Sequence, residues 1–181
     1  MCWFRPRKDK SATMSAGVVF TDGKLMLCGY QPHKVQPCIS GIGGKCEAGE
    51  DVFTCAIREM IEELFEIKHA VPGLIWTVKE VAPHGVLTNQ GYYMVIYSFE
   101  DLERILRALQ TFGLHSPLYD VFPICLNDLL FKRKTDSISA EISHLALLPL
   151  VHHNSIDSGF VDSYLIDDMK AILARCKELA K

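Results

Sequence analysis

The chain has 181 residues, of which 49% are hydrophobic and 23% are charged, and its formal net charge is −3. This length and composition predict one soluble globular domain with a sizeable core and argue against two domains. The negative net charge gives no general attraction to nucleic acid, so RNA binding would need a local basic patch.

Cysteine usage and hydropathy bear on the compartment. The seven cysteines are odd in number, irregularly spaced and without a CxxC pair. They predict free thiols in a reducing compartment, without a disulfide framework, a disulfide-linked partner or a zinc site. We expect a cytoplasmic protein without a membrane span, because no apolar run is long enough and the N-terminus lacks the apolar core of a signal peptide. The cysteines are Cys2, Cys28, Cys38, Cys46, Cys55, Cys125 and Cys176.

The N-terminal segment differs from the rest of the chain. Residues 1–14 carry four basic side chains beside a tryptophan and a phenylalanine. This composition is typical of a flexible basic arm, and the functional alternative is a strap over a nucleotide. We expect residues 15–181 to form a single domain.

Two short strands open this domain. Ser15–Phe20 and Lys24–Tyr30 have strand-like composition, and Thr21-Asp22-Gly23 between them is typical of a hairpin turn. Gln31–Gln36 predicts a loop. Cys38–Ile42 predicts a short strand that leads into a glycine-rich segment.

The stretch from Gly43 to Ile67 is the most informative part of the sequence. From Glu50 onward it predicts a helix, because it lacks Gly and Pro and spaces its apolar residues at helical intervals. Arg58 is the one cation near four carboxylates that repel each other, so a divalent ion such as Mg²⁺ or Mn²⁺ is the stronger explanation for the cluster. These carboxylates share one helix face: Glu59, Glu62, Glu63 and Glu66.

Glycines precede this helix. They allow the backbone to approach a ligand closely, and a glycine-rich loop that opens a helix offers free N–H groups to a phosphate. We therefore predict a loop that meets a pyrophosphate, followed by a helix that holds the bridging metal. The glycines are Gly41, Gly43, Gly44 and Gly49.

Beyond the helix, strand-like and helical patterns are mixed, which predicts an α/β fold with a mixed sheet between helices. Gly73–Val81 and Tyr92–Phe99 predict strands, with a turn at Pro83–Thr88 between them. Glu100–Phe112 has the spacing of an amphipathic helix. The remaining expected elements are a strand-like piece at Tyr119–Cys125, a short helical turn capped by Asn127 or Asp128 and ending at Phe131, a helix at Ser137–Leu148 and a C-terminal helix at Asp162–Lys181.

The glycine-rich loop and its helix resemble the Nudix box. In that pattern, a glycine and a glutamate precede an Arg-Glu pair, an apolar residue and a Glu-Glu pair at fixed spacings. The sequence departs at Phe65, where the pattern has glycine, and at Glu66, where it has an apolar residue. Without that glycine we expect the helix to continue for another turn towards Pro72-Gly73. The matching positions are Gly44, Glu50, Arg58, Glu59, Met60, Glu62 and Glu63.

The resemblance implies an α/β/α Nudix sandwich with extra C-terminal helices, and a hydrolase that uses Mg²⁺ or Mn²⁺. Glu62 and Glu63 would be metal ligands and would include the base. Glu59 would be a further ligand, and the Gly43 carbonyl a backbone ligand. The resemblance also implies a pair between Arg58 and Glu50 that holds the loop against the helix; the alternative is an ordinary surface salt bridge.

Residues outside the box are candidates for substrate contacts. Gly44, Lys45, Trp76 and Glu141 are expected to contact substrate, and Lys132–Lys134 would meet phosphates if the substrate is RNA, although such a run is usually solvated. Strand aromatics are more often core residues than base-stacking ones, and exposed carboxylates are more often only solvated. The stacking candidates are Trp76, Tyr92, Tyr93 and Phe99, and the candidates for a non-box carboxylate are Glu80, Glu100, Asp120 and Glu141, the last being favoured.

Three functions remain open. The first is a pyrophosphohydrolase that cleaves a nucleoside diphosphate linked to another group, by water attack at phosphorus. The second is an mRNA-decapping hydrolase that releases m7GDP in a host cytoplasm, because a compact Nudix domain with extra helices resembles the decapping enzymes of large DNA viruses. The third is a non-catalytic nucleotide-binding module, which the intact glutamates argue against and only Phe65 supports.

Overall fold

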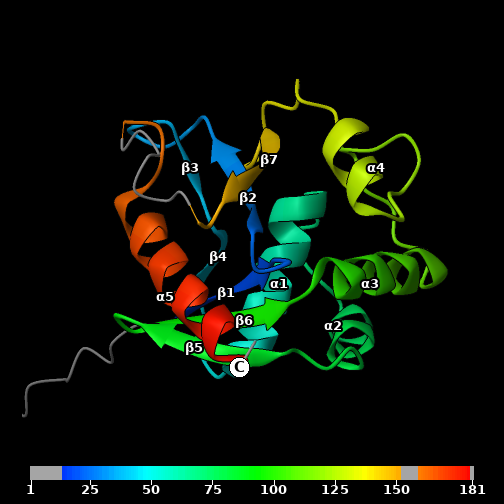
Figure 1. Cartoon of the computed structure of the whole chain (residues 1–181). Coiled ribbons are helices and arrows are strands. Elements are labelled where there is room, and N and C mark those ends of the chain that lie inside the picture. The colour runs from blue at the N-terminus through cyan, green and yellow to red at the C-terminus, as the bar shows by residue number, and fades with distance from the viewer. Residues whose placement is uncertain (1–13, 152–158, 180–181) are drawn as a thin grey trace, which may run out of the picture.

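The computed structural model describes residues 14–151 and 159–179, which contain seven strands and five helices (Figure 1). The strands are β1 (Ser15–Phe20), β2 (Leu25–Gln31), β3 (Cys38–Ser40), β4 (Ile42–Lys45), β5 (Gly85–Asn89), β6 (Tyr92–Tyr97) and β7 (His144–Pro149). The helices are α1 (Val52–Phe65), α2 (Pro72–Lys79), α3 (Phe99–Thr111), α4 (Leu126–Phe131) and α5 (Ser163–Leu179). No helix among the described residues has the length and apolarity needed to cross a bilayer.

The strands form two sheets between layers of helices. One sheet has the order β4-β1-β6-β5, with β1 and β6 parallel and the other neighbours antiparallel. The second has the order β3-β2-β7 and is antiparallel. Helices α1 to α4 lie on one side of the strands and α5 on the other (Figure 1). The expected α/β/α sandwich with a mixed sheet is confirmed.

Two apolar clusters, one on each side of the strands, hold the layers together. The first joins the apolar face of α1 to β1, β6 and helices α2 to α4, and the second joins α5 to the opposite faces of β1, β2 and β6. Side chains of successive strand residues point to opposite faces, so Val18 enters the first cluster and Val19 the second. The predicted strands at 15–20 and 92–99 and the predicted helix at 100–112 are confirmed within one to two residues. The predicted helix at 162–181 is confirmed over Ser163–Leu179, and residues 180–181 lie outside the described part of the chain.

The prediction of a strand at Gly73–Val81 and a turn at Pro83–Thr88 is wrong. Pro72 begins α2, where its missing N–H costs nothing, and the buried side chains of Leu74 and Val78 lie one helical turn apart. The next segment is the edge strand β5, which a tight turn joins to β6. Gln90 and Gly91 in that turn have φ of 47° and 82°, the left-handed conformation that a two-residue hairpin requires.

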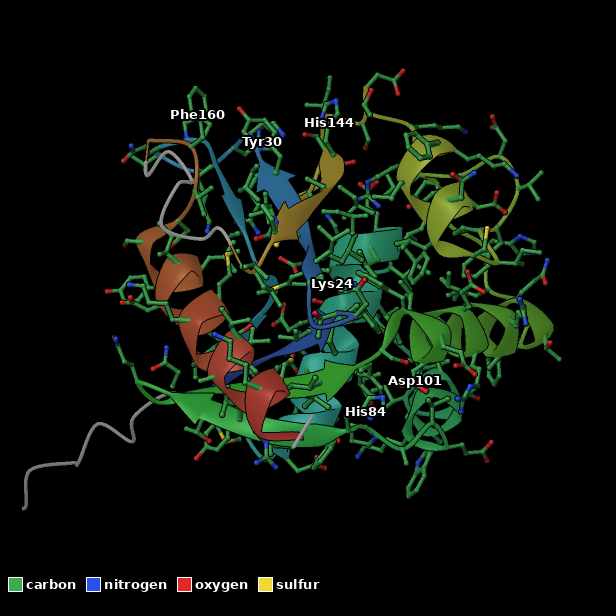
Figure 2. The ribbon with its side chains drawn as sticks, in the orientation of Figure 1. Lys24, Tyr30, His84, Asp101, His144 and Phe160 are labelled. Atoms are coloured by element: carbon green, nitrogen blue, oxygen red, sulfur yellow. A yellow bond between two sulfur atoms is a disulfide. The ribbon has the colours of Figure 1, made fainter. Side chains whose placement is uncertain are left out.

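The prediction of a helix at Ser137–Leu148 is also wrong. Its second half is β7, which pairs with β2 so that Tyr30 faces His144, and Figure 2 shows both side chains at the same end of that sheet. A continuous apolar run such as Leu145–Leu148 does not distinguish a buried strand from a helix. The segment is a strand here because it pairs with the edge of β2 that β3 leaves open.

Three shorter expectations need correction. Tyr119–Cys125 is irregular, because its apolar residues pack on α1 without joining a sheet. Cys38–Ile42 is interrupted at Gly41, so that β3 and β4 join different sheets. The cap of α4 is Cys125, whose Sγ accepts from the Asp128 N–H, rather than Asn127 or Asp128.

Helix α1 ends at Phe65 and does not continue towards Pro72. Glu66 adopts φ 56° and its N–H bonds to the Glu62 carbonyl, so the chain leaves the helix without a glycine. Phe65 is fully buried and stacks on Phe122 with ring centroids 5.0 Å apart. The residue that departs from the box therefore serves the core.

The prediction that all cysteines are free is wrong for two of them. Cys46 and Cys55 form a disulfide across the loop between β4 and α1, with Cα atoms 5.0 Å apart. A spacing of nine residues carries no sequence signal for pairing, and the turn at Gly49, with φ 89°, brings the two together. Four others are free thiols in the described part of the chain: Cys28, Cys38, Cys125 and Cys176. Cys2 and the predicted basic arm over residues 1–13 lie outside the described residues.

Candidate active site

The loop between β4 and α1 is held in a defined shape by short-range hydrogen bonds. Asp51 caps α1 by accepting from the N–H groups of Phe53 and Thr54, both at 2.9 Å. The Glu47 N–H donates to Glu50 Oε2 at 2.7 Å. The loop therefore delivers Glu50 to the side of the helix with its carboxylate already oriented.

Arg58 joins this loop to the helix. Its Nε and Nη2 donate to the two oxygens of Glu50 at 2.8 and 3.0 Å, and Nη2 also donates to the Lys45 carbonyl at 3.0 Å. Its Nη1 donates to Glu59 and Glu62 at 3.0 and 3.1 Å. The predicted Arg58–Glu50 pair is confirmed, and because Arg58 is only 8% exposed it is not an ordinary surface salt bridge.

Glu63 is a buried carboxylate beside the glycine loop. It is 4% exposed; Oε2 accepts from the Gly43 N–H at 2.7 Å, and Oε1 accepts from Gln31 Nε2 at 3.0 Å. Burial, together with repulsion from Glu141, raises the pKa of Glu63 well above its usual value. Within the described residues no cation forms an ion pair with it, so its charge is largely uncompensated.

A second carboxylate from outside the box meets Glu63 through Gln31. Gln31 Nε2 also donates to Glu141 Oε1, at 3.2 Å. Glu141 lies in the irregular segment before β7 rather than on a helix, and its neighbour Ile142 packs directly over Gly29. A side chain at position 29 would collide with Ile142, so this glycine allows the segment to approach β2.

Glu59 and Glu62 complete the acidic cluster. The Glu59 carboxylate lies against Gly44, where an added Cβ would be 2.6 Å from it. Burial raises the pKa of both carboxyls, although Arg58 offsets part of the effect. Glu66, the fourth glutamate of the predicted face, points elsewhere and accepts from Ser137 and Ser139.

Tyr92 covers the glycine loop. A Cβ on Gly17 or Gly43 would overlap the Tyr92 hydroxyl, and Gly43 has φ 152°. Burial raises the pKa of Tyr92, and the carboxylates of Glu63 and Asp168 raise it further. Both glycines are therefore required by the ring above them, and the ring is close enough to Glu63 and Asp168 for their charges to act on its hydroxyl.

A cavity of about 560 Å³ opens beside these residues. Its wall includes Gln31, Gly43, Tyr92 and Glu141 on the side of the box, and it extends to the β5–β6 turn and to α5. The volume lies within the range of ligand pockets. Of the predicted site residues, Gly43 and Glu141 line the cavity. Glu63 joins them through its hydrogen bonds with the Gly43 N–H and with Gln31.

Several other predicted site residues lie away from this cavity. Trp76 is 69% exposed on α2, and Tyr93 and Phe99 pack against the core. His84 and Asp101, which the sequence analysis does not single out, form a separate pair at 3.0 Å, and Figure 2 shows them near the start of α3. Lys45 is exposed at the end of β4 and presents its carbonyl to Arg58. The other non-box carboxylates, Glu80, Glu100 and Asp120, are exposed, and the last two pair with Arg104 and Lys134.

The basic run at Lys132–Lys134 is not a uniformly solvated patch. Arg133 is 7% exposed and donates to the carbonyls of Glu63, Leu64 and Ile142 at 3.0, 2.6 and 2.6 Å. Sequence reasoning missed this residue, since an arginine inside a charged run gives no signal of burial. Lys132 and Lys134 pair with Asp128 and Asp120 at 2.7 and 2.6 Å.

Arg133 completes the C-terminal cap of α1, where Glu66 instead of a glycine adopts the left-handed conformation. The last carbonyls of a helix need hydrogen-bond donors. The Glu62 carbonyl accepts from the Glu66 N–H, and the carbonyls of Glu63 and Leu64 accept from Arg133. The Phe65 carbonyl accepts from Ser116 Oγ at 2.8 Å. The guanidinium also places its positive charge at the negative end of the helix dipole. The helix end that carries Glu63 is thereby held firmly.

The donor set fits a hard divalent cation. The clustered ligands are carboxylate oxygens, the most buried of them lacks an ion-pair partner in the described chain, and carboxylates in such surroundings are typical Mg²⁺ or Mn²⁺ ligands. Among the described residues, the one group that brings three ligand atoms within 4.8 Å of one another is Cys46, Glu50 and Cys55. That group does not suit a metal, because its sulfurs are joined to each other and Glu50 is engaged by Arg58.

Comparisons with known proteins find one family model and several similar solved structures. A family model for the NUDIX domain matches residues 12–116. The chain is similar to a NUDIX hydrolase from Nitrosomonas europaea, at 12% identity over 93% of this chain and 90% of that one, with a TM-score of 0.43. It is also similar to a C. elegans Ap4A hydrolase, at 15% identity over 93% and 97% of the two chains with a TM-score of 0.44, and to the MutT protein from Methanosarcina mazei Go1, at 14% over 93% and 95% with a TM-score of 0.45.

The family model shows the family, whereas the solved structures have low identities and TM-scores. A search of curated proteins gives no match. The family model covers more than half of the chain and includes the entire box from Gly44 to Glu66. The chain therefore belongs to the Nudix family of hydrolases, which act on phosphoanhydride bonds.

Proposed function

We propose that the protein is a divalent-metal-dependent pyrophosphohydrolase that cleaves the diphosphate linkage of a nucleoside diphosphate joined to another group, by water attack at phosphorus. The observation that supports this most strongly is the buried Glu63, with Glu141 and Glu59 close to it and no ion-pair partner in the described chain. A protein gains nothing in stability from such a cluster unless a ligand compensates the charge.

Each residue has a role in this proposal. Glu59, Glu62, Glu63 and the Gly43 carbonyl would hold Mg²⁺ or Mn²⁺, which supplies charge neutralisation on phosphate oxygens and acidifies a bound water. Glu63 or Glu62 accepts the proton of the attacking water, and the raised pKa of either carboxyl brings it closer to the range of an effective base. Arg58 keeps Glu50, Glu59 and Glu62 in place.

The alternatives gain less support. A decapping activity would use a basic surface for RNA, but the lysines of the 132–134 run are paired with carboxylates and Arg133 is buried. A non-catalytic module was suggested only by Phe65, and Phe65 has a packing role that explains it. Decapping is therefore kept as one outcome of the activity assay.

The direct test is an activity panel. The protein is incubated with Mg²⁺ or Mn²⁺ and with nucleoside triphosphates, nucleotide sugars, dinucleoside polyphosphates and cap-labelled RNA, in water enriched in ¹⁸O. We expect cleavage of a diphosphate linkage with one ¹⁸O atom in a phosphate of the product. Release of m7GDP from RNA alone would favour decapping, and absence of turnover with every substrate would overturn the proposal.

Mg²⁺ should raise the melting temperature by mass action, because it binds the folded acidic cluster and not the unfolded chain. At a free concentration of about 100 times Kd, the stabilisation is about 2.7 kcal/mol, or roughly 5–10 °C for a chain of this length. Differential scanning fluorimetry measures the shift, with KCl of equal ionic strength as the control. An unchanged melting temperature at millimolar Mg²⁺, with and without nucleotide, would contradict the metal assignment.

A further inference from the structure

The cavity beside the box continues well beyond the acidic cluster. Its far wall is formed by Asn89, Gln90 and Gly91 of the β5–β6 turn and by Tyr164 and Asp168 of α5. If the proposed function holds, a substrate whose phosphates meet the box can extend its nucleoside into this space. The groups on the far wall then decide which nucleoside fits.

Asp168 is the principal polar group on that wall. It is partly buried, and its Oδ1 accepts from Asn89 Nδ2 at 2.8 Å, which fixes the plane of the carboxylate. Burial raises the pKa of Asp168, and repulsion from Asp167 and Asp162 adds to the effect. An oriented carboxylate in such surroundings is stabilised by a ligand that brings hydrogen-bond donors.

Gln31 provides an independent sign that the cavity takes a ligand with donors. This side chain is 3% exposed, and while its Nε2 serves Glu63 and Glu141, its Oε1 has no hydrogen-bond partner among the described residues. A buried acceptor without a donor is costly, so it indicates a group that arrives with the ligand. Gln31 lines the cavity near the box, where a ribose hydroxyl would donate to it.

We propose that the cavity binds the nucleoside of a guanine nucleotide, with Asp168 as the residue that determines base specificity. The Watson–Crick edge of guanine presents two adjacent donors, N1–H and the N2 amino group, to the two oxygens of a carboxylate. Adenine presents an amino donor beside the N1 acceptor, and that acceptor would face a carboxylate oxygen. Asn89 holds Asp168 in the orientation that makes this distinction.

Aromatic side chains complete the site. Tyr164 on α5 is 70% exposed, and Tyr92, the cross-strand neighbour of Asn89, lies over the glycine loop; both line the cavity. Either ring can cover a face of the base, since every base has a π-face that stacks on tyrosine. Lys34 lies at the mouth, paired with Asp162 at 3.4 Å, and is available to a phosphate when that weak pair opens.

The test compares kcat/KM for GTP, ITP and ATP in the wild type and in Asp168→Asn. We expect the order GTP, ITP, ATP in the wild type, because hypoxanthine keeps N1–H but lacks the amino group. An asparagine side chain would present one acceptor and one donor, so Asp168→Asn should lower kcat/KM for GTP by roughly 10- to 100-fold and raise it for ATP. Asp167→Asn is the matched control, since Asp167 pairs with Lys170 at 2.9 Å and does not line the cavity.

Two further measurements separate this inference from the proposed function. Titration calorimetry gives the Kd of GDP and of ADP for the Glu63→Gln variant, and so measures base preference in the absence of turnover. Equal affinity for both, or an equal effect of Asp167→Asn and Asp168→Asn, would overturn the guanine assignment and leave the hydrolase proposal standing. Guanosine-capped RNA is added to the kcat/KM comparison of the wild type, to show whether the preferred guanine belongs to a free nucleotide or to an RNA end. Cleavage of the free nucleotide or of the capped RNA with a preference for guanine supports the assignment.

Discussion

Glu63→Gln should lower kcat by roughly 10²–10⁴-fold, as expected for loss of a metal ligand or general base, while the metal-free protein becomes more stable at neutral pH. Both effects have the same origin. The carboxylate that we propose as metal ligand or base is 4% exposed and lies near Glu141 and Glu59, so its charge destabilises the folded chain when no metal is bound. Glutamine keeps the shape and the acceptor for the Gly43 N–H, but removes the charge.

The pH dependence of stability follows from the same carboxyl. The pKa of Glu63 is raised in the folded chain, so the folded state binds the proton more tightly than the unfolded state, whose pKa is about 4.3. This contribution to stability is fully present below the unfolded pKa and is lost as pH rises through the folded pKa. The stability gain of Glu63→Gln should therefore be absent near pH 4 and grow towards neutral pH, and saturating Mg²⁺ should reverse it.

Denaturation curves across pH and single-turnover rates check these outcomes. Glu66→Gln is the matched control, because Glu66 follows the same helix but binds Ser137 and Ser139, whereas Glu63 binds Gly43 and Gln31. We expect near-normal turnover for that control. A Glu63→Gln variant with near-normal turnover, or one less stable than the wild type at neutral pH without metal, would refute the assignment of Glu63.

The sequence predicted best where local chemistry alone determines the structure. The box helix and the cluster of Glu59 and Glu63 follow from spacing, since helical periodicity places such residues on one face. The Arg58–Glu50 pair follows from the resemblance to the Nudix box. The turn at Thr21–Gly23 follows from turn chemistry. These features need no information about the rest of the chain.

The parts that could not be predicted depend on contacts between distant segments. The run Leu145–Leu148 is a strand because it pairs with the edge of β2 that β3 does not occupy. Glu141 reaches the site on an irregular segment rather than on the expected helix. Nothing in the sequence marks Gln31 as a site residue, because a single glutamine in a loop-like stretch is common. Its role comes from carboxylates 32 and 110 residues away in sequence.

Arg133 is the clearest case of a residue whose role depends on contacts with distant segments. Arg133→Met should reduce the free energy of unfolding by at least about 3 kcal/mol, because three buried carbonyls each lose their partner. For a chain of this length the melting temperature should fall by roughly 6 °C or more. Lys134→Met, beside it in sequence but paired on the surface with Asp120, should leave the melting temperature almost unchanged.

The effect on catalysis distinguishes a positioning role from a merely structural one. Arg133 ties the end of α1, which carries Glu63, to Ile142, which adjoins Glu141, so it sets the separation of the two carboxylates. At a temperature where Arg133→Lys is fully folded, we expect kcat to fall by about tenfold with KM nearly unchanged, since lysine keeps the charge but lacks the planar fork that serves several carbonyls. Thermal denaturation and steady-state kinetics of the two Arg133 variants measure both effects. Loss of stability with an unchanged kcat in the folded Arg133→Lys protein would show that Arg133 only caps the helix and that Glu63 and Glu141 are positioned independently.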